Sequence, residues 1–222
     1  MKRPLCLPVF AASFWTGANA NPNQLNERQA TMAFWHFSTC VVNRSPKAAE
    51  ALLDKRDWTD AEYYALTRLA DSGADCLFPG DELRVKKELF RGSIAGAMFL
   101  KNRLGQSLPT YAANPAAFAF PNPGSLSNEQ EYQRALRLTF ADCVFRIKPE
   151  DVRRLLASRP FSKDETLQWQ QLNPILGDCL PATEGTQVRF ARIVMRGLLG
   201  EAAYAEDSAA AGKTSLGEGA SH

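Results

Sequence analysis

The sequence predicts an all-α protein that contains two tandem homologous four-helix units, each closed by one disulfide. Three observations predict it: an internal repeat, the same cysteine spacing in both copies, and helix-start signals at equivalent positions. Self-similarity at one fixed displacement indicates a duplicated structural unit. No stretch shows the period-two alternation of polar and apolar residues that is typical of strands.

The internal repeat becomes visible when the chain is displaced by 103 residues (143 − 40). Cys40 then meets Cys143 and Cys76 meets Cys179, so that 36 residues separate the cysteines of each copy (76 − 40 and 179 − 143). The other matched pairs include Phe37 and Phe140, Val41 and Val144, Pro46 and Pro149, Leu52 and Leu155, Leu69 and Leu172, and, after a two-residue insertion, Arg84 and Arg189, and Arg91 and Arg196.

The first twenty residues have the features of a secretory signal peptide. Lys2 and Arg3 precede an apolar stretch, and Ala18-Asn19-Ala20 places small residues where a signal peptidase cleaves. The apolar stretch is shorter than the roughly 20 residues that cross a bilayer, and charges interrupt every later apolar run, so we expect no transmembrane segment. We expect residues 1–20 to be removed.

The repeat and the composition divide the rest of the chain. A Pro/Ala-rich stretch separates the copies, and the chain becomes rich in Ala, Gly and Ser near its end. The predicted parts are a first helical repeat (21–105), a linker (106–125), a second helical repeat (126–205) and a disordered tail (206–222).

Four helices are expected in each copy. The first spans about 26–42 and 127–145, with a capping box at Ser127-x-x-Gln130. The second starts at Pro46 or Pro149, where the missing N–H costs nothing, and the third starts with a capping box that ends on Glu62 or Glu165. The fourth spans about 81–101 and 187–205. In the first copy it contains Gly92-x-x-x-Gly96, whose small residues permit close helix packing. In the second copy one buried face is predicted by apolar residues at spacings of three and four: Val188, Ala191, Met195, Leu198 and Ala202.

Removal of the signal peptide also removes Cys6 and leaves Cys40, Cys76, Cys143 and Cys179. The repeat favours a disulfide within each copy, although pairing across the copies would respect the same symmetry. No Cys-x-x-Cys spacing is present and the chain has 2 histidines, so we expect no metal and no cofactor. Loss of Lys2 and Arg3 lowers the formal net charge from +2 to 0, which argues against nucleic-acid binding.

The residues Cys143-Val144, Pro149, Leu155-Leu156, Cys179-Leu180 and Arg196-Gly197, with their first-copy partners, form a pattern that is similar to secreted proteins of alphaproteobacteria. The resemblance covers both copies. It implies a location in the bacterial envelope and implies no activity.

Basic residues on the fourth helix of each copy are the candidate binding site. They recur at i, i+3 and i+7 and therefore share one helical face, where arginine suits carboxylate and phosphate partners. A solvated face paired with nearby acidic residues explains the same pattern without binding. The six residues are Arg84, Lys87, Arg91, Arg189, Arg192 and Arg196.

Several other polar residues have structural interpretations. Glu62 and Glu165 are explained by their capping boxes. Asp75 and Asp178 are expected in turns. Arg56 and Arg159 are expected to bond the carbonyl groups at the end of the second helix. His36 lies between Trp35 and Phe37 and is expected to be structural, since no nucleophile motif accompanies it.

These features favour an exported, non-catalytic binding or adaptor protein of the periplasm or the medium of a Gram-negative bacterium. Its partner would be a protein or an anionic envelope component. The alternatives are a hydrolase or lyase with carboxylates in a cleft between the copies, and an inhibitor of an envelope enzyme. Fold alone does not decide among them.

Overall fold

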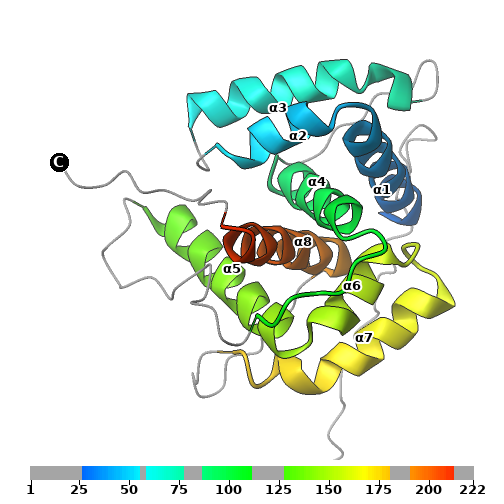
Figure 1. Cartoon of the computed structure of the whole chain (residues 1–222), viewed down its shortest axis with the longest axis vertical. Helices are drawn as coiled ribbons and strands as arrows, with labels where there is room; N and C mark the ends of the chain where they lie inside the picture. Colours follow the sequence, from blue (N-terminus) through cyan, green and yellow to red (C-terminus); the bar gives the residue numbers. More distant parts are fainter. Residues whose placement is uncertain (1–26, 56–58, 78–86, 112–127, 181–190, 213–222) are drawn as a thin grey trace, which may run out of the picture.

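The computed structural model describes residues 27–55, 59–77, 87–111, 128–180 and 191–212, and the signal-like segment lies outside these ranges. The described residues form eight α-helices and one 3-10 turn without a strand, which confirms the all-α prediction (Figure 1). The elements are α1 (Glu27–Arg44), α2 (Pro46–Leu53), α3 (Asp60–Ser72), η1 (Ala74–Cys76), α4 (Lys87–Asn102), α5 (Glu129–Ile147), α6 (Pro149–Ala157), α7 (Lys163–Leu176) and α8 (Arg192–Ala210).

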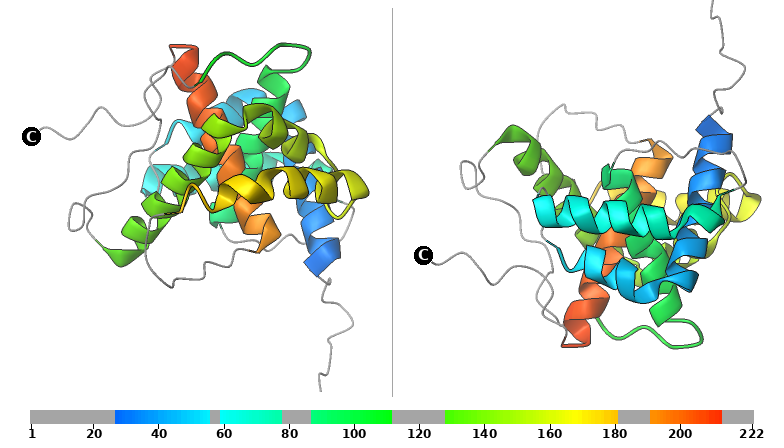
Figure 2. Two further views of the ribbon diagram at one scale, coloured as in Figure 1. Left: turned by 90° about the horizontal axis from the view of Figure 1, so that it is seen from below. Right: turned by 90° about the horizontal axis from the view of Figure 1, so that it is seen from above.

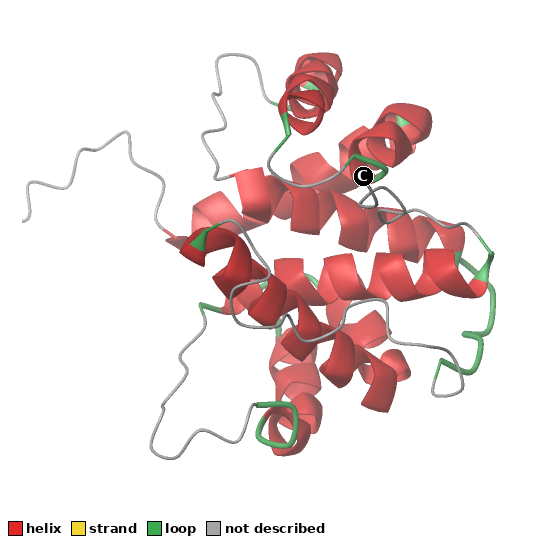
Figure 3. Cartoon of the chain, turned by 90° about the vertical axis from the view of Figure 1, so that its left-hand side faces the viewer, coloured by secondary structure: helices red, strands yellow, loops and turns green. Residues whose placement is uncertain are grey.

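Two helices form the centre of the molecule. α4 and α8 lie next to each other at the centre of Figure 1 and make the most extensive helix–helix contact. Figure 3 shows the described part of the chain as helices joined by loops and turns. α1 and α2 pack against α4 on one side, with α3 against α2, and α5 and α6 pack against α8 on the other, with α7 against α6 and α5. The outermost helices are α3, which lies in front when the molecule is seen from above, and α7, which lies in front from below (Figure 2). Each half therefore contributes one long helix to a shared core.

Glycines allow α4 and α8 to approach closely. A Cβ atom on Gly92 would lie 2.6 Å from the carbonyl oxygen of Gly197, and one on Gly200 would lie 3.0 Å from the Cα atom of Gly96. Later residues of α4 meet later residues of α8, so the two helices run in the same direction. The close packing that the Gly92-x-x-x-Gly96 spacing predicts is thus confirmed, and the neighbour is the equivalent helix of the other half.

The predicted N-caps are confirmed for α3 and α7, the third helices of the two halves, and the predicted N-cap of α5 is wrong by one residue. Thr59 Oγ1 accepts a hydrogen bond from the Glu62 N–H at 3.2 Å, and Ser162 Oγ accepts one from the Glu165 N–H at 3.0 Å. In α5 the cap is Asn128, whose side-chain oxygen accepts from the Glu131 N–H at 2.9 Å. The expected box on Ser127 was therefore wrong by one position, because an Asn-x-x-Glu arrangement satisfies the same first-turn donors.

Both disulfides join cysteines of the same half. Cys40 is bonded to Cys76, and Cys143 is bonded to Cys179, each across a sequence separation of 36 residues. Each bond connects the first long helix of its half to the segment that follows the third. Closing a loop of this length stabilises a fold by roughly 4 kcal/mol on the chain-entropy estimate.

The ends of α8 differ from the predicted boundaries. Ala191 has an extended backbone (ψ 138°) and is exposed, so the helix begins after the expected Gln187 and Ala191 does not belong to its buried face. At the other end, α8 continues to Ala210, past the expected start of the tail at Glu206. Glu206 and Asp207 are buried, and they pair with Arg146 of α5 and with Arg103, which directly follows α4. The expected start of α4 at Asp81 lies outside the described residues.

The described part of the predicted linker, residues 106–111, is irregular but anchored. Tyr111 is buried, and its ring packs against Phe145 with 4.8 Å between the centroids. Its hydroxyl group donates to Asp207 Oδ1 at 3.1 Å. The linker therefore begins with a segment that is fastened to the core by α5 and α8.

Candidate functional site

Arg91 and Arg196, the equivalent arginines of α4 and α8, are both buried, with 5% and 8% of their surface exposed. The Arg91 guanidinium donates to the carbonyl oxygens of Leu52 (3.0 Å) and Leu53 (2.9 Å). The Arg196 guanidinium donates in the same way to Leu156 (2.7 Å) and Ser158 (2.6 Å). These carbonyls lie at the C-terminal ends of α2 and α6, where a helix has few internal donors left for its last oxygens; the Leu52 oxygen also accepts from the Lys55 N–H at 3.1 Å.

The same arginines meet the capping-box glutamates. Arg196 Nη1 lies 3.0 Å from Glu165 Oε1, and Arg91 Nη1 lies 3.6 Å from Glu62 Oε1. Glu165 also accepts the backbone N–H of Phe161 through Oε2 at 2.6 Å. One buried ion pair in each half thus ties the end of the second helix, the start of the third and the central helix together. Sequence analysis identified the caps but missed these pairs, because the partners are far apart in the chain.

This arrangement corrects two predictions. Arg91 and Arg196 do not belong to a solvent-facing basic stripe, because their charges are used inside the protein. The role expected of Arg56 and Arg159 at the end of the second helix is filled by Arg91 and Arg196, which reach it from the central helices. Arg159 is exposed, and Arg56 lies outside the described residues.

Of the other four residues in the predicted basic stripe, the structure describes the side chain of Arg192 alone. Arg192 is exposed at the first turn of α8. Lys87 begins α4, but its side chain is not described, and Arg84 and Arg189 lie outside the described ranges. The structure therefore does not bring the six basic residues together on one face.

Burial lowers the pKa of the Arg196 guanidinium from its usual value, and the charge of Glu165 and its hydrogen bond oppose this shift. An arginine remains protonated under such a shift, since its ordinary pKa is very high. Arg196 and Glu165 therefore form an ion pair inside the protein, and their opposite charges cancel.

Three more acidic residues are buried along α8, and each meets an arginine. Glu201 Oε2 lies 2.5 Å from Arg134 Nη2, and Glu206 Oε1 lies 3.0 Å from Arg146 Nη1. Asp207 pairs with Arg103 and accepts from Tyr111. These pairs connect α8 to α5 and to the end of α4. Sequence analysis did not single them out, because Glu206 and Asp207 fell in the predicted tail and the arginine partners are far away in the chain.

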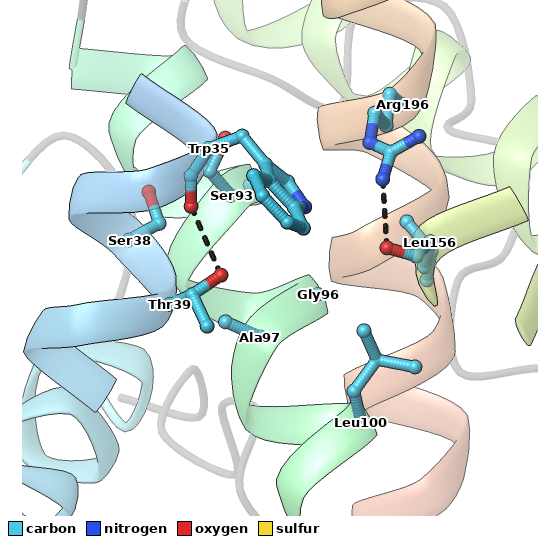
Figure 4. Close-up of a pocket in the computed structure, with 10 residues that line it drawn as sticks. Trp35, Ser38, Thr39, Ser93, Gly96, Ala97, Leu100, Leu156 and Arg196 are labelled. Atoms are coloured by element: carbon cyan, nitrogen blue, oxygen red, sulfur yellow. Dashed lines mark hydrogen bonds between the residues drawn. The ribbon is translucent and has the colours of Figure 1, made fainter. Parts of the chain in front are cut away.

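A small pocket lies at the junction of the halves, with a cavity volume of about 30 Å³ (Figure 4). Small residues of α4 form its floor, Trp35 and two hydroxyl residues of α1 form one wall, and residues of α6 and α8 form the other. Among the residues that the structure describes, none of those that line it is acidic. The lining residues are Trp35, Ser38, Thr39, Gly92, Ser93, Gly96, Ala97, Leu100, Leu156 and Arg196.

The N-terminal end of α1 contacts the second half directly. The guanidinium carbon of Arg28 lies 5.8 Å from the centroid of the Phe161 ring. Phe161 has a φ of 59°, which is uncommon for a residue with a side chain. Its N–H donates to Glu165, so the start of α7 holds this conformation. Arg28 and Trp35 are seven positions apart and share one face of α1.

The other polar residues that the sequence analysis singled out, His36, Asp75 and Asp178, do not line the pocket. His36 is exposed on α1, next to Phe37, which the helix buries. Asp75 lies in η1 and pairs with Arg44 at 2.7 Å, and Asp178 is exposed in a turn, as expected.

Among the residues that the structure describes, no group of three or more His, Cys, Asp or Glu side chains is placed to hold a metal ion. None of the described helices combines the length and apolar character needed to cross a membrane. Comparisons with protein-family models, curated proteins and solved structures found no significant match to the chain.

Proposed function

We propose that the chain is an exported, non-catalytic binding or adaptor protein of the bacterial envelope that contacts a protein partner through the exposed face of α3. The observation that carries this proposal is a pair of exposed tyrosines on that helix. Tyr63 and Tyr64 are 62% and 65% exposed. Their rings meet edge to face with 6.0 Å between the centroids.

The tyrosines are presented by a helix that is held firmly. Thr59 caps its first turn, and the Cys40–Cys76 disulfide fixes the segment that follows it. Tyrosine is enriched at protein interfaces because it buries a large apolar area, keeps a polar group and loses little side-chain entropy. A rigid aromatic pair on an outer helix is therefore suited to bind another protein.

The corresponding helix of the second half differs at these positions. Displacement by 103 residues places Thr166 and Leu167 of α7 opposite Tyr63 and Tyr64 (166 − 63). Both are exposed, and neither is aromatic. If the halves arose by duplication, as the aligned residues favour, the aromatic pair belongs to one copy only. This asymmetry supports a specialised role for α3.

Export is supported by the signal-like start of the chain and by the two disulfides, which persist in oxidising compartments such as the periplasm. The buried carboxylates favour binding over acid–base chemistry, because Glu62, Glu165 and Glu201 each lie against an arginine. An anionic partner of the basic faces would use Arg192, since Arg91 and Arg196 are buried.

The proposal is tested by cross-linking the tagged mature protein in its native envelope. We expect one protein to copurify in near-equal amount with the wild type, and to be lost with the double variant Tyr63→Ala, Tyr64→Ala. The matched control is Thr166→Ala, Leu167→Ala, which changes the same positions on α7 and should retain the partner. Equal recovery with the tyrosine variant would refute the role of α3, and an unprocessed N-terminus before Asn21 would refute export.

A further inference from the structure

The pocket between the halves has several hydrogen-bond donors that no residue in the described part of the chain accepts from. The Arg196 guanidinium makes its bonds to Glu165, Leu156 and Ser158 through Nη1 and Nη2, which leaves its Nε–H without a partner among the described residues. The Trp35 indole N–H and the Ser93 hydroxyl group also have no partner there. Figure 4 shows the Trp35 ring extending across the pocket toward Arg196.

The hydroxyl groups of Ser38 and Thr39, which also line the pocket, donate their hydrogens to carbonyl oxygens of α1. Ser38 Oγ donates to the Phe34 carbonyl oxygen and Thr39 Oγ1 donates to the Trp35 carbonyl oxygen, each at 2.9 Å. Their oxygens can still accept a hydrogen bond. The pocket therefore offers three donors on Arg196, Trp35 and Ser93, and two acceptors on α1.

The charge of the pocket is balanced. Arg196 is paired with Glu165, and no other charged residue in the described part of the chain lines the pocket. A carboxylate placed here would be a buried charge without a counter-charge of its own, which is costly. A neutral group that carries both a carbonyl oxygen and an N–H fits the donors and acceptors without this cost.

Size limits the occupant further. A cavity of about 30 Å³ holds about two water molecules, so only a small end group can enter. Gly92, Gly96 and Ala97 line the floor, but the Cβ positions of the two glycines face α8 and Leu156 and not open space. The ring of Trp35 supplies an apolar surface beside it.

We infer that this pocket binds the acetamido or backbone-amide end of a small neutral ligand, with the carbonyl oxygen accepting from Arg196, Trp35 or Ser93. This site is separate from the proposed partner surface on α3 and does not depend on it. The same chemistry has two sources in a bacterial envelope: an N-acetylated amino sugar and a peptide amide.

The test uses the mature full-length chain and follows the NMR signal of the Trp35 indole N–H, assigned with Trp35→Phe. The probes are N-acetylglucosamine and N-acetylalaninamide, with glucosamine and acetate as controls that lack an amide. We expect a saturable shift with at least one amide probe and none with the controls. The probe that binds more tightly identifies the source. No shift with either amide probe, or an equal response to acetate, would overturn the inference.

A second measurement separates specific binding from a general effect on the fold. Ser93→Ala removes a hydroxyl group that has no described protein partner, so the melting temperature should not change. The affinity for the amide probe should fall by about 2- to 10-fold, the worth of one hydrogen bond. Ser72→Ala, on α3, removes a hydroxyl group that bonds the Leu69 carbonyl and should leave the affinity unchanged. Unchanged affinity in Ser93→Ala would overturn the assignment of that residue.

Discussion

Gly92 of α4 and Gly197 of α8 occupy equivalent positions in the two halves and face each other where the central helices cross. A Cβ atom on Gly92 would lie 2.6 Å from the carbonyl oxygen of Gly197, whereas a Cβ atom on Gly197 would lie 3.7 Å from the nearest atom of Gly92. The contact is therefore tight for one glycine and ordinary for the other.

This difference predicts that the same substitution, glycine to alanine, changes the free energy of unfolding differently at the two positions. Gly92→Ala should lower the free energy of unfolding by about 1–3 kcal/mol, because the added carbon meets backbone that cannot move aside. Gly197→Ala should be neutral or stabilising by up to about 1 kcal/mol, since alanine favours a helix over glycine. Chemical denaturation of both variants measures the difference. A Gly92→Ala protein as stable as Gly197→Ala would contradict the described packing of α4 on α8.

The buried pair of Arg196 and Glu165 predicts strong coupling. Arg196→Met should cost about 3–5 kcal/mol of unfolding free energy, because it leaves Glu165 buried without its counter-charge. Adding Glu165→Gln should recover part of this loss, as a double-mutant cycle would show. The control is Arg44→Met, which removes an exposed pair with Asp75 and should cost less than about 1 kcal/mol. Additive losses in the cycle would show that the two side chains do not interact.

The disulfides close loops of equal length and should contribute equally. Replacing Cys40 and Cys76 by alanine should lower stability by roughly 4 kcal/mol, and replacing Cys143 and Cys179 should lower it by a similar amount, since chain entropy depends on loop length. Urea denaturation of the two double variants tests this expectation. A large difference between them would mean that native-state packing, and not loop closure, sets the contribution of each bond.

Alkaline pH should weaken the fold through Tyr204. Burial raises the pKa of its hydroxyl group to about 12, and the charges of Asp54 and Glu50 add to the shift. An unfolded tyrosine ionises near pH 10, so between about pH 10 and 12 the unfolded state loses a proton that the folded state keeps. The stabilisation is complete below pH 10 and is lost as the pH rises toward 12.

The measurement is the free energy of unfolding as a function of pH. Tyr204→Phe should reduce its fall between pH 10 and 12, and ultraviolet absorbance of tyrosinate should follow the ionisation. Tyr64→Phe, at an exposed position, is the control and should leave the slope as in the wild type. The same slope in Tyr204→Phe and in the wild type would show that burial of Tyr204 does not govern alkaline stability.

Local signals in the sequence predicted the starts of the third helices and favoured the disulfide pairing. Thr59 and Ser162 mark helix starts because a cap is an interaction within one turn. The aligned cysteines favoured pairing within each half because both copies keep the same separation. Such features depend on residues close in the chain or on a repeated spacing, and a single sequence shows both.

The burial of charge could not be predicted in this way. Helical periodicity places Arg84, Lys87 and Arg91 on one face, but it does not say whether that face meets solvent or another helix. Arg91 and Arg196 are inside because α2 and α6 end beside the central helices and offer unpaired carbonyl groups.

The sequence by itself determined the helical class, the two halves and the capped starts of the third helices, and it favoured the cysteine partners that the structure shows. Only the tertiary structure decided that α8 is buried on all sides from Met195 to Ser208 and that its acidic residues lie inside. The physical reason is that α8 lies between α4 and α5, helices far from it in the chain, whose arginines neutralise its carboxylates. The pocket depends on the same packing, since Trp35, Ser93 and Arg196 meet only where the two halves join.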